Sequence, residues 1–482
     1  MGKIRATIID SETGGTINAK AQVIDSSGNY VHPKKAIQKV GPGQPFFYTD
    51  GSFEVDVNRG NTRITVERGT EYTPETIYLE SSPKSNKSIE IELSRWNDLQ
   101  EQGWHPGNTH IHYDEKENRP DERLHLDPRV ENLRMTAVSV LKRWDLNYST
   151  NKYPIGFLND FSSDHHYVQN GEESRHNQKP WEIGYGHIML LDIRNVVDPL
   201  SRGLLVDAFE PDYPPLSYAC DVAHQQGGTV IWCHNGQGME APVAAALGKI
   251  DAFNLFDPYW NDTEYDIYYQ MLNAGIKLPA STGSDWYICS SNRVYSWTGN
   301  NFEYGEWLDS FKKGRTFITN GPSLKIQVGD SNPGDEIQSK SGESVAAQVQ
   351  WTSHYPVQII ELVQNGEVVG REKYPDGSTK GIFKMDVNLE FDGWIAARLF
   401  SSFRDSYLQP QFAHTSPIYV KTGLASAKKT DASLKFAQQI EGSLEWVRRK
   451  GRFYNDYQRQ EIETLFREAQ DIYRSRASEN PS

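Results

Sequence analysis

The sequence predicts a multidomain α/β protein with a β-sandwich at each side of a central α/β unit and a helical hairpin at the end. Its 482 residues are too many for a single hydrophobic core. Strand-like alternation fills residues 1–97 and 323–424, whereas strand and helix patterns alternate over residues 98–322. Residues 425–482 show helical periodicity. We therefore expect four structural units with these boundaries.

The first unit has the pattern of short antiparallel strands. Apolar residues alternate with polar ones at Phe53, Val55 and Val57, directly after the turn signal Asp50-Gly51. Similar runs recur along the first hundred residues without a helical period. Each such strand has one apolar face to bury, so a sandwich of about seven strands is expected.

The central unit alternates apolar runs with amphipathic stretches. The predicted strands are Met135–Leu141, His187–Ile193, Thr229–Cys233, Ala252–Phe256 and Lys277–Ala280, and the predicted helices are Leu216–Gln226, Ala241–Leu247, Glu264–Asn273 and Glu306–Lys313. Such repetition is typical of a parallel sheet with crossover helices, closed as a barrel or left open. Catalytic groups gather at the strand ends of such barrels, where His234, Asp257 and Asp285 fall.

The third and fourth units follow different periods. Asn365-Gly366 between Gln358–Val363 and Glu367–Val369 predicts a hairpin with a type I′ turn in a second β-sandwich. Beyond it, two apolar stripes at helical spacing are separated near Gly451, which indicates a two-helix hairpin. The first stripe comprises Leu434, Ala437, Ile440, Leu444 and Val447, and the second Ile462, Leu465, Phe466, Ala469 and Ile472.

Composition narrows the class of protein. A formal net charge of −14 argues against nucleic acid as a partner, because phosphate contacts need clustered Lys and Arg. No apolar run is long enough to span a membrane. Three scattered cysteines fit neither a disulfide framework nor a thiolate zinc site. The start of the chain lacks an apolar signal core, as in a cytoplasmic protein, although a removed signal segment would make it periplasmic or secreted. The oligomeric state is left open.

A His-x-His pair marks the centre of the expected chemistry. In an extended strand, His110 and His112 point to the same face, so their rings converge. Converging neutral imidazoles are good ligands for zinc, manganese or iron. Ten of the thirteen histidines lie between His105 and His234. Histidines and carboxylates also recur in five later segments, which together supply the donors of a hydrolytic metal centre. They are Asp164-His165-His166, Asn170–Asn177, Gly186-His187, Cys233-His234-Asn235 and Gly283–Trp286.

These segments resemble the CehA/McbA family of metallohydrolases, a branch of the PHP (polymerase and histidinol phosphatase) superfamily. The motifs that carry the resemblance are GNTHIH, NGEESRHN with GYGHIMLLDI, GGTVIWCHN, PASTGSDW with SNRVY, and GRTFITNGP. The resemblance spans nearly the whole chain. It implies a carboxypeptidase-regulatory-like β-sandwich, then a distorted PHP-like (β/α) barrel, a second β-sandwich and C-terminal helices.

The resemblance also implies a set of metal ligands. They are His110, His112, Glu173 as a carboxylate that bridges two metals, His187, His234 and Asp285. Two motifs of the superfamily are missing: Tyr287 stands where an Asp-x-His histidine is usual, and no clean Thr-Asp-His motif follows the second strand. We therefore expect one or two divalent ions of zinc, manganese or iron rather than three.

Several assignments stay open at this point. Glu172 is an alternative ligand to Glu173, and His165 and His166 are either ligands or surface residues. His176 is the best candidate for a general acid that protonates the leaving group. Arg175 either anchors an anionic substrate or pairs with a ligand carboxylate.

Three functions are compatible with these residues. The first is a hydrolase that uses metal-activated water on an ester, carbamate or amide bond of a small molecule, as the family implies. The second is a PHP-type phosphoesterase, which should present two or three cationic side chains near the metals; only Arg175 and Arg293 are placed suggestively. The third is a metal- or glycan-binding protein without catalysis.

Overall fold

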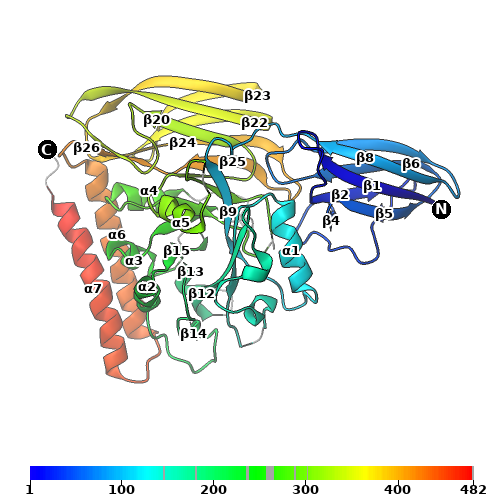
Figure 1. Ribbon diagram of the computed structural model, residues 1–482. Coiled ribbons are helices and arrows are strands. Elements are labelled where there is room, and N and C mark those ends of the chain that lie inside the picture. Colours follow the sequence, from blue (N-terminus) through cyan, green and yellow to red (C-terminus); the bar gives the residue numbers. More distant parts are fainter. Residues whose placement is uncertain are drawn as a thin grey trace.

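The structure is a computed structural model that describes residues 1–144, 147–179, 182–234, 238–256, 265–286, 289–300 and 302–479. It is a mixed α/β protein rich in strands (Figure 1). Asn235, Asp257, Tyr287 and the first residue of the predicted helix Glu264–Asn273 lie outside the described residues.

The N-terminal strands form two sheets around a hydrophobic core of their own. One sheet has the order β5 (Ser52–Val57), β1 (Gly2–Asp10), β8 (Asn86–Leu93). The other joins β3 (Tyr30–Val31), β2 (Ala19–Ile24), β6 (Gly60–Glu67) and β7 (Glu75–Ser81), with β4 (Phe47–Thr49) paired to β2. Inward-facing residues such as Ile4, Val23 and Val55 fill the space between the two sheets, as the alternating pattern predicts.

The central strands pair in a closed ring. The ring runs β9 (Trp104–Ile111), β10 (Met135–Val140), β12 (Tyr167–Lys179), β13 (Glu182–Leu191), β15 (Thr229–Trp232), β16 (Ala252–Phe256) and β17 (Ala280–Thr282). A bridge between Ile111 and Asp285 returns the ring to β9. The last predicted strand begins three residues later than expected, at Ala280.

The ring differs from an all-parallel sheet at β12 and β13. These two strands form an antiparallel hairpin, and β13 is also antiparallel to β15. The sequence of β12, YVQNGEESRHNQK, is too polar to be recognised as a strand, yet ten of its thirteen residues are fully buried. A buried strand with so many polar groups needs partners for them, which points to a functional interior.

Helices surround the ring at the predicted places, with one addition. The helices α2 (Leu216–Gln225), α3 (Ala241–Ala246), α4 (Asp266–Asn273) and α5 (Tyr304–Lys312) match the expected stretches within a few residues. The unexpected helix is α1 (Pro120–Val130), which carries Pro128 within it and has only a weak apolar face. Because of the proline and the weak apolar face, hydrophobic periodicity does not predict this helix.

The C-terminal strands continue the same sheet into a second layer. β18 (Arg293–Trp297) pairs with β9 and with β19 (Thr316–Thr319), and β19 pairs with β25 (Pro410–Thr415). The remaining strands are β20 (Ser323–Val328), β21 (Glu336–Gln338), β22 (Glu343–Gln364), β23 (Glu367–Leu389), β24 (Gly393–Arg404) and β26 (Ile418–Lys421). Asn365 and Gly366 join β22 to β23 with φ of 51° and 84°, which confirms the predicted turn.

Two long helices close the chain, as predicted. α6 (Ala427–Arg449) and α7 (Asp456–Ser478) pack on each other and on α3, along one side of the central unit (Figure 1). Most of both apolar stripes are buried, but Leu434 is 53% exposed, so the first stripe is narrower than expected. In the part of the chain that the structure describes, no helix is both long and apolar enough to cross a membrane.

Candidate metal centre

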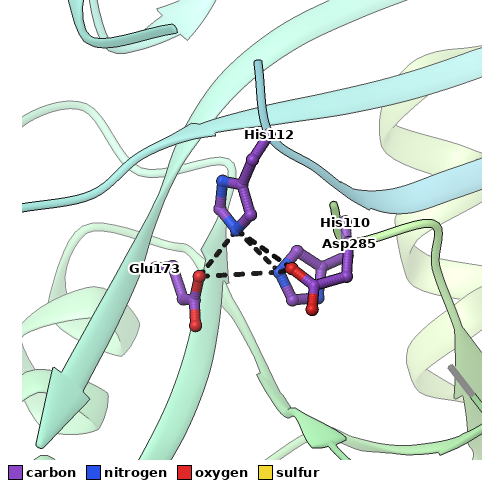
Figure 2. A group of neighbouring side chains, drawn as sticks. All are labelled: His110, His112, Glu173 and Asp285. Carbon is purple, nitrogen blue, oxygen red and sulfur yellow. Dashed lines mark hydrogen bonds and ion pairs between the residues drawn. The ribbon is translucent and has the colours of Figure 1, made fainter. Parts of the chain in front are cut away.

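Four side chains from distant parts of the sequence meet inside the ring. His110, His112, Glu173 and Asp285 point toward one another (Figure 2). His112 Nε2 lies 2.6 Å from Glu173 Oε2, and His110 Nε2 lies 3.4 Å from Asp285 Oδ1. All four side chains are at most 5% exposed. This geometry is that of a closely spaced set of nitrogen and oxygen donors.

A second group shares one carboxylate with the first. His187 Nδ1 and His234 Nε2 lie 3.2 Å and 3.4 Å from Glu173 Oε1, while Glu173 Oε2 faces His110 and His112. The two oxygens of Glu173 thus serve different histidine pairs. A carboxylate in this position can bridge two cations.

Strand direction explains how His187 reaches the centre. His187 is the sixth of the ten residues of β13, whereas His110 lies near the end of β9 and His234 follows the end of β15. Because β13 runs antiparallel to β15, the backbone next to His187 lies at the carboxyl end of β15, where Ile188 pairs with Trp232.

Two of the clustered residues have a left-handed backbone. His234 has φ of 55° and Asp285 has φ of 48°, which is uncommon for residues other than glycine. At Asp285 the conformation is held by backbone hydrogen bonds, since Asp285 N–H donates to His110 O and His112 N–H donates to Asp285 O. Such conformations cluster at functional sites, where the surrounding structure enforces them.

Neighbouring polar groups fix the orientation of two imidazoles. His187 Nε2 lies 2.6 Å from Asn177 Oδ1, and His112 Nδ1 lies 3.0 Å from Ser139 Oγ. The amide oxygen is an acceptor, so Nε2 of His187 carries the proton and Nδ1 presents its lone pair to Glu173. Partners of this kind orient histidines in metal sites.

The arrangement fits a cation better than it fits a set of hydrogen bonds. Glu173 Oε1 and His187 Nδ1 are both buried and have no hydrogen-bond partner among the described residues. Since each presents a lone pair to the other at 3.2 Å, a positive charge between them would satisfy both. His110 Nε2 and His112 Nε2 lie 2.9 Å apart, where one can donate to the other or both can face a shared cation. Buried His110, His112, Glu173 and Asp285, and Glu173, His187 and His234, can therefore hold metal ions.

The protonation states favour metal ligation. Burial lowers the pKa of His112 to about 4 and that of His187 to about 3, so both imidazoles are neutral at pH 7. Burial opposes ionisation of Glu173, but Arg175 and the two histidines His112 and His110 outweigh it and hold the pKa of Glu173 well below its ordinary value. Neutral imidazoles around an ionised carboxylate are the ligand forms that bind a divalent cation.

The structure separates Glu173 from its neighbour Glu172. Successive residues of β12 point to opposite faces, and Glu172 Oε2 accepts from the backbone N–H of Val197 on the other face at 2.6 Å. Burial raises the pKa of Glu172 to about 8, so this carboxyl is largely protonated at pH 7. Glu172 therefore does not join the cluster.

His165 and His166 also lie apart from the cluster. His165 is exposed, and His166 Nδ1 donates to the carbonyl oxygen of Leu133 at 2.8 Å. Neither belongs to the two groups of donors around Glu173.

His176 occupies a different environment from the one expected for a general acid. Its Nε2 donates to Asp212 Oδ1 at 2.8 Å, and its Nδ1 accepts from the backbone N–H of Tyr185 at 2.7 Å. The ring is fully buried and stacks on Tyr185 with centroids 4.1 Å apart. Both ring nitrogens are engaged on the face of β12 opposite Glu173, so the structure does not bring His176 to the cluster, where a general acid is expected.

His176 instead links the ligand-bearing hairpin to the C-terminal helices. Asp212 accepts from Arg452 Nη2 at 2.9 Å and from Arg452 N–H at 2.8 Å. Arg452 lies between α6 and α7, and its Nη1 donates to Ala208 O. The contacts from Arg452 through Asp212 to His176 therefore support β12 on the face opposite Glu173.

Removing this link is expected to destabilise the protein. Arg452→Ala leaves the buried Asp212 carboxylate with fewer donors and should lower the free energy of unfolding by about 1–3 kcal/mol. Urea denaturation measures the difference. The matched control is Arg449→Ala on the same hairpin, whose ion pair with Glu445 is exposed and should change the free energy of unfolding by less than about 1 kcal/mol. Equal changes in the free energy of unfolding for the two substitutions would contradict a stabilising role of the contacts between Arg452, Asp212 and His176.

The sequence places two cationic side chains, Arg175 and Arg293, near the expected metal ligands, and only Arg175 lies at the cluster. Arg175 Nε lies 3.5 Å from Glu173 Oε1, and neither Nε nor Nη1 has a hydrogen-bond acceptor among the described residues. Arg293 is buried elsewhere: it donates to the backbone oxygen and to the carboxylate of Glu131, and to Ser291 O. Arg175 thus has donors to spare for a ligand, and Arg293 does not.

Ser139 and Asn177 contribute to the centre although the sequence did not single them out. Ser139 is a polar residue near the carboxyl end of a predicted apolar strand, which is a usable signal. Asn177 lies on the same face of β12 as Glu173 and Arg175, because alternate residues of a strand point to the same side. The sequence reveals this only if residues 167–179 are known to form a strand.

Comparison with known proteins adds no relative: no family model matches the chain, and no curated protein matches its sequence.

Proposed function

We propose that the protein is a metal-dependent hydrolase that cleaves an ester, carbamate or amide bond of a small molecule. The observation that carries the proposal is the position of Glu173, whose two oxygens face two separate pairs of histidines. Four histidines and two carboxylates suit zinc, manganese or iron, and the shared carboxylate suits two ions. We also propose that the ring of strands around them is a PHP-like barrel.

The bound cations would supply Lewis acidity, both to activate a water molecule and to polarise the bond that is cleaved. The chain's own residues determine where this happens. Ser139 and Asn177 keep the His112 and His187 rings in place, so the donors need no rearrangement. The guanidinium of Arg175, which has unused donors, would bind the oxygen that gains negative charge in the transition state.

Charge distinguishes the carboxyl-type substrates from phosphoesters. A phosphoryl group carries more negative charge and is usually bound by several cations. Arg293 is occupied by Glu131, which leaves Arg175 as the one of these two arginines that is available. The net charge of −14 also disfavours polyanionic substrates.

Elemental analysis combined with a substrate panel tests the proposal. We expect one to two equivalents of zinc, manganese or iron per chain, and hydrolysis of small carboxylic esters, carbamates or amides that stops after chelation. His110→Ala should lower both the metal content and the activity. Substoichiometric metal together with activity that is indifferent to His110→Ala would overturn the proposal. Hydrolysis of phosphoesters alone would replace it with the phosphoesterase.

A further inference from the structure

A cleft lies at the opposite end of β9 from the metal centre. Its walls come from the beginning of β9, the end of β18 and strand β20, and its volume is about 450 Å³. The lining includes Gln102, Trp104, Trp297, Arg315, Lys325 and Asn332. Six residues of extended strand separate Trp104 from His110, which corresponds to about 20 Å. The cleft is therefore a separate feature from the metal centre.

Two indole rings form part of the wall. Trp104 and Trp297 are directly opposite each other in the antiparallel pair β9–β18, so their side chains share one face of the sheet. Trp104 is held by an edge contact with Phe317, whose ring centroid is 5.1 Å away. Trp297 is 43% exposed. Large aromatic side chains left open beside a cleft are typical of binding sites.

Two cations border the same cleft. Lys325 Nζ donates to Gln102 Oε1 at 2.6 Å, and Arg315 directly precedes β19. Within the described part of the chain, no carboxylate forms an ion pair with either cation. The carboxylate of Asp335 also borders the cleft, but its Oδ2 accepts from the backbone N–H of Asn332. The cleft thus carries a net positive charge in a chain whose net charge is −14.

We propose that this cleft binds an acidic carbohydrate, specifically a pyranose residue that carries a carboxylate. The apolar C–H face of a pyranose packs against an indole, as flat apolar groups do in aromatic-lined sites. The carboxylate pairs with Arg315 and Lys325. Hydroxyl groups on the ring edge bond the side-chain amide of Asn332 and the second lone pair of Gln102 Oε1; Gln102 Nε2 already donates to Asn97 Oδ1 and Asp98 O. An aromatic acid would satisfy the indoles and the cations but has no hydroxyl groups for the Asn332 amide.

The proposal does not depend on the chemistry of the metal centre. An acidic glycan held about 20 Å away would anchor the protein to a carbohydrate surface without occupying the metal centre. Failure of one proposal therefore leaves the other standing.

Calorimetric titration tests the cleft. The probes are short homo-oligosaccharides of galacturonate, glucuronate and mannuronate, each compared with its neutral counterpart. We expect at least one acidic series to bind with a Kd below about 1 mM and its neutral counterpart to bind at least about tenfold more weakly. Trp297→Ala should weaken binding at least about tenfold, because an indole platform is lost. Arg315→Gln should remove the preference for the acidic sugar.

The matched control is Tyr78→Ala, an exposed aromatic residue on the N-terminal sandwich, which should leave binding unchanged. Thermal unfolding identifies a variant that fails to fold, and Arg315→Gln changes an exposed side chain, so it tests the cleft without disturbing the core. Three results would overturn the proposal: no binding of any uronate at this level, equal binding of acidic and neutral sugars, or uronate binding that survives both Trp297→Ala and Arg315→Gln. Tighter binding of benzoate or of adenosine monophosphate would assign the cleft to another ligand class.

Discussion

Glu173→Gln is expected to remove most of the bound metal and to lower hydrolytic activity on the order of a thousandfold. The amide keeps the shape of the side chain but loses the negative charge, and its NH₂ group presents hydrogens where a cation needs lone pairs. Because Glu173 faces both histidine pairs, one substitution affects both groups of donors. Elemental analysis and kcat/KM for the best substrate of the panel measure the two effects.

The neighbouring residue supplies the control for this experiment. In Glu172→Gln, an amide replaces a carboxyl group that is already largely neutral, since burial raises its pKa to about 8. Metal content and kcat/KM should therefore stay close to those of the unchanged protein. Equal losses in both variants would mean that the substitutions damage β12 in general. Full metal content in Glu173→Gln would show that the Glu173 carboxylate is not needed to hold the cations and would overturn its bridging role.

Arg175→Gln is expected to lower kcat by about a hundredfold to a thousandfold without loss of metal. The guanidinium borders the carboxylate of Glu173 and has donors that no described residue accepts. Its removal takes a stabilising charge from the transition state. It also removes a positive charge next to the cation site, so metal affinity should stay the same or increase. Steady-state kinetics and a competition assay with a metal chelator give the two values.

The direction of the metal effect decides between the two roles considered for Arg175. If Arg175 mainly holds Glu173 in place, Arg175→Gln should release metal and lower activity together. The control is Lys179→Gln on the same strand, where the side chain is 69% exposed and pairs with Glu182. This substitution should leave kcat and metal content unchanged. Unchanged kcat in Arg175→Gln would exclude a role for the guanidinium in the transition state.

Local patterns predicted much of the fold because they reflect local physics. The turn at Asn365-Gly366 needs two residues that tolerate positive φ, and the C-terminal helices need apolar residues on one face. Both requirements are written in consecutive residues. Strand β12 was missed for the opposite reason: its buried residues are polar, so hydrophobic periodicity says nothing about it.

The same limit explains why His176 was expected at the cluster although the structure places it elsewhere. A histidine three residues from Glu173 looks like part of the same site when the intervening chain has no assigned structure. Once residues 167–179 form a strand, the odd-numbered residues Glu173, Arg175 and Asn177 face the cluster, and His176 faces Asp212.

The sequence by itself determined which residue types are available for a metal centre, and where most of the helices and apolar strands lie. Imidazoles and carboxylates next to apolar runs are local facts, and the pairing of His110 with His112 follows from the period of a strand. Only the tertiary structure decided which of these groups meet. The antiparallel hairpin of β12 and β13 brings His187 opposite Arg175 and beside the carboxyl end of β15, and it sets which face of β12 points inward. That choice depends on contacts between residues far apart in the chain, which no local pattern records.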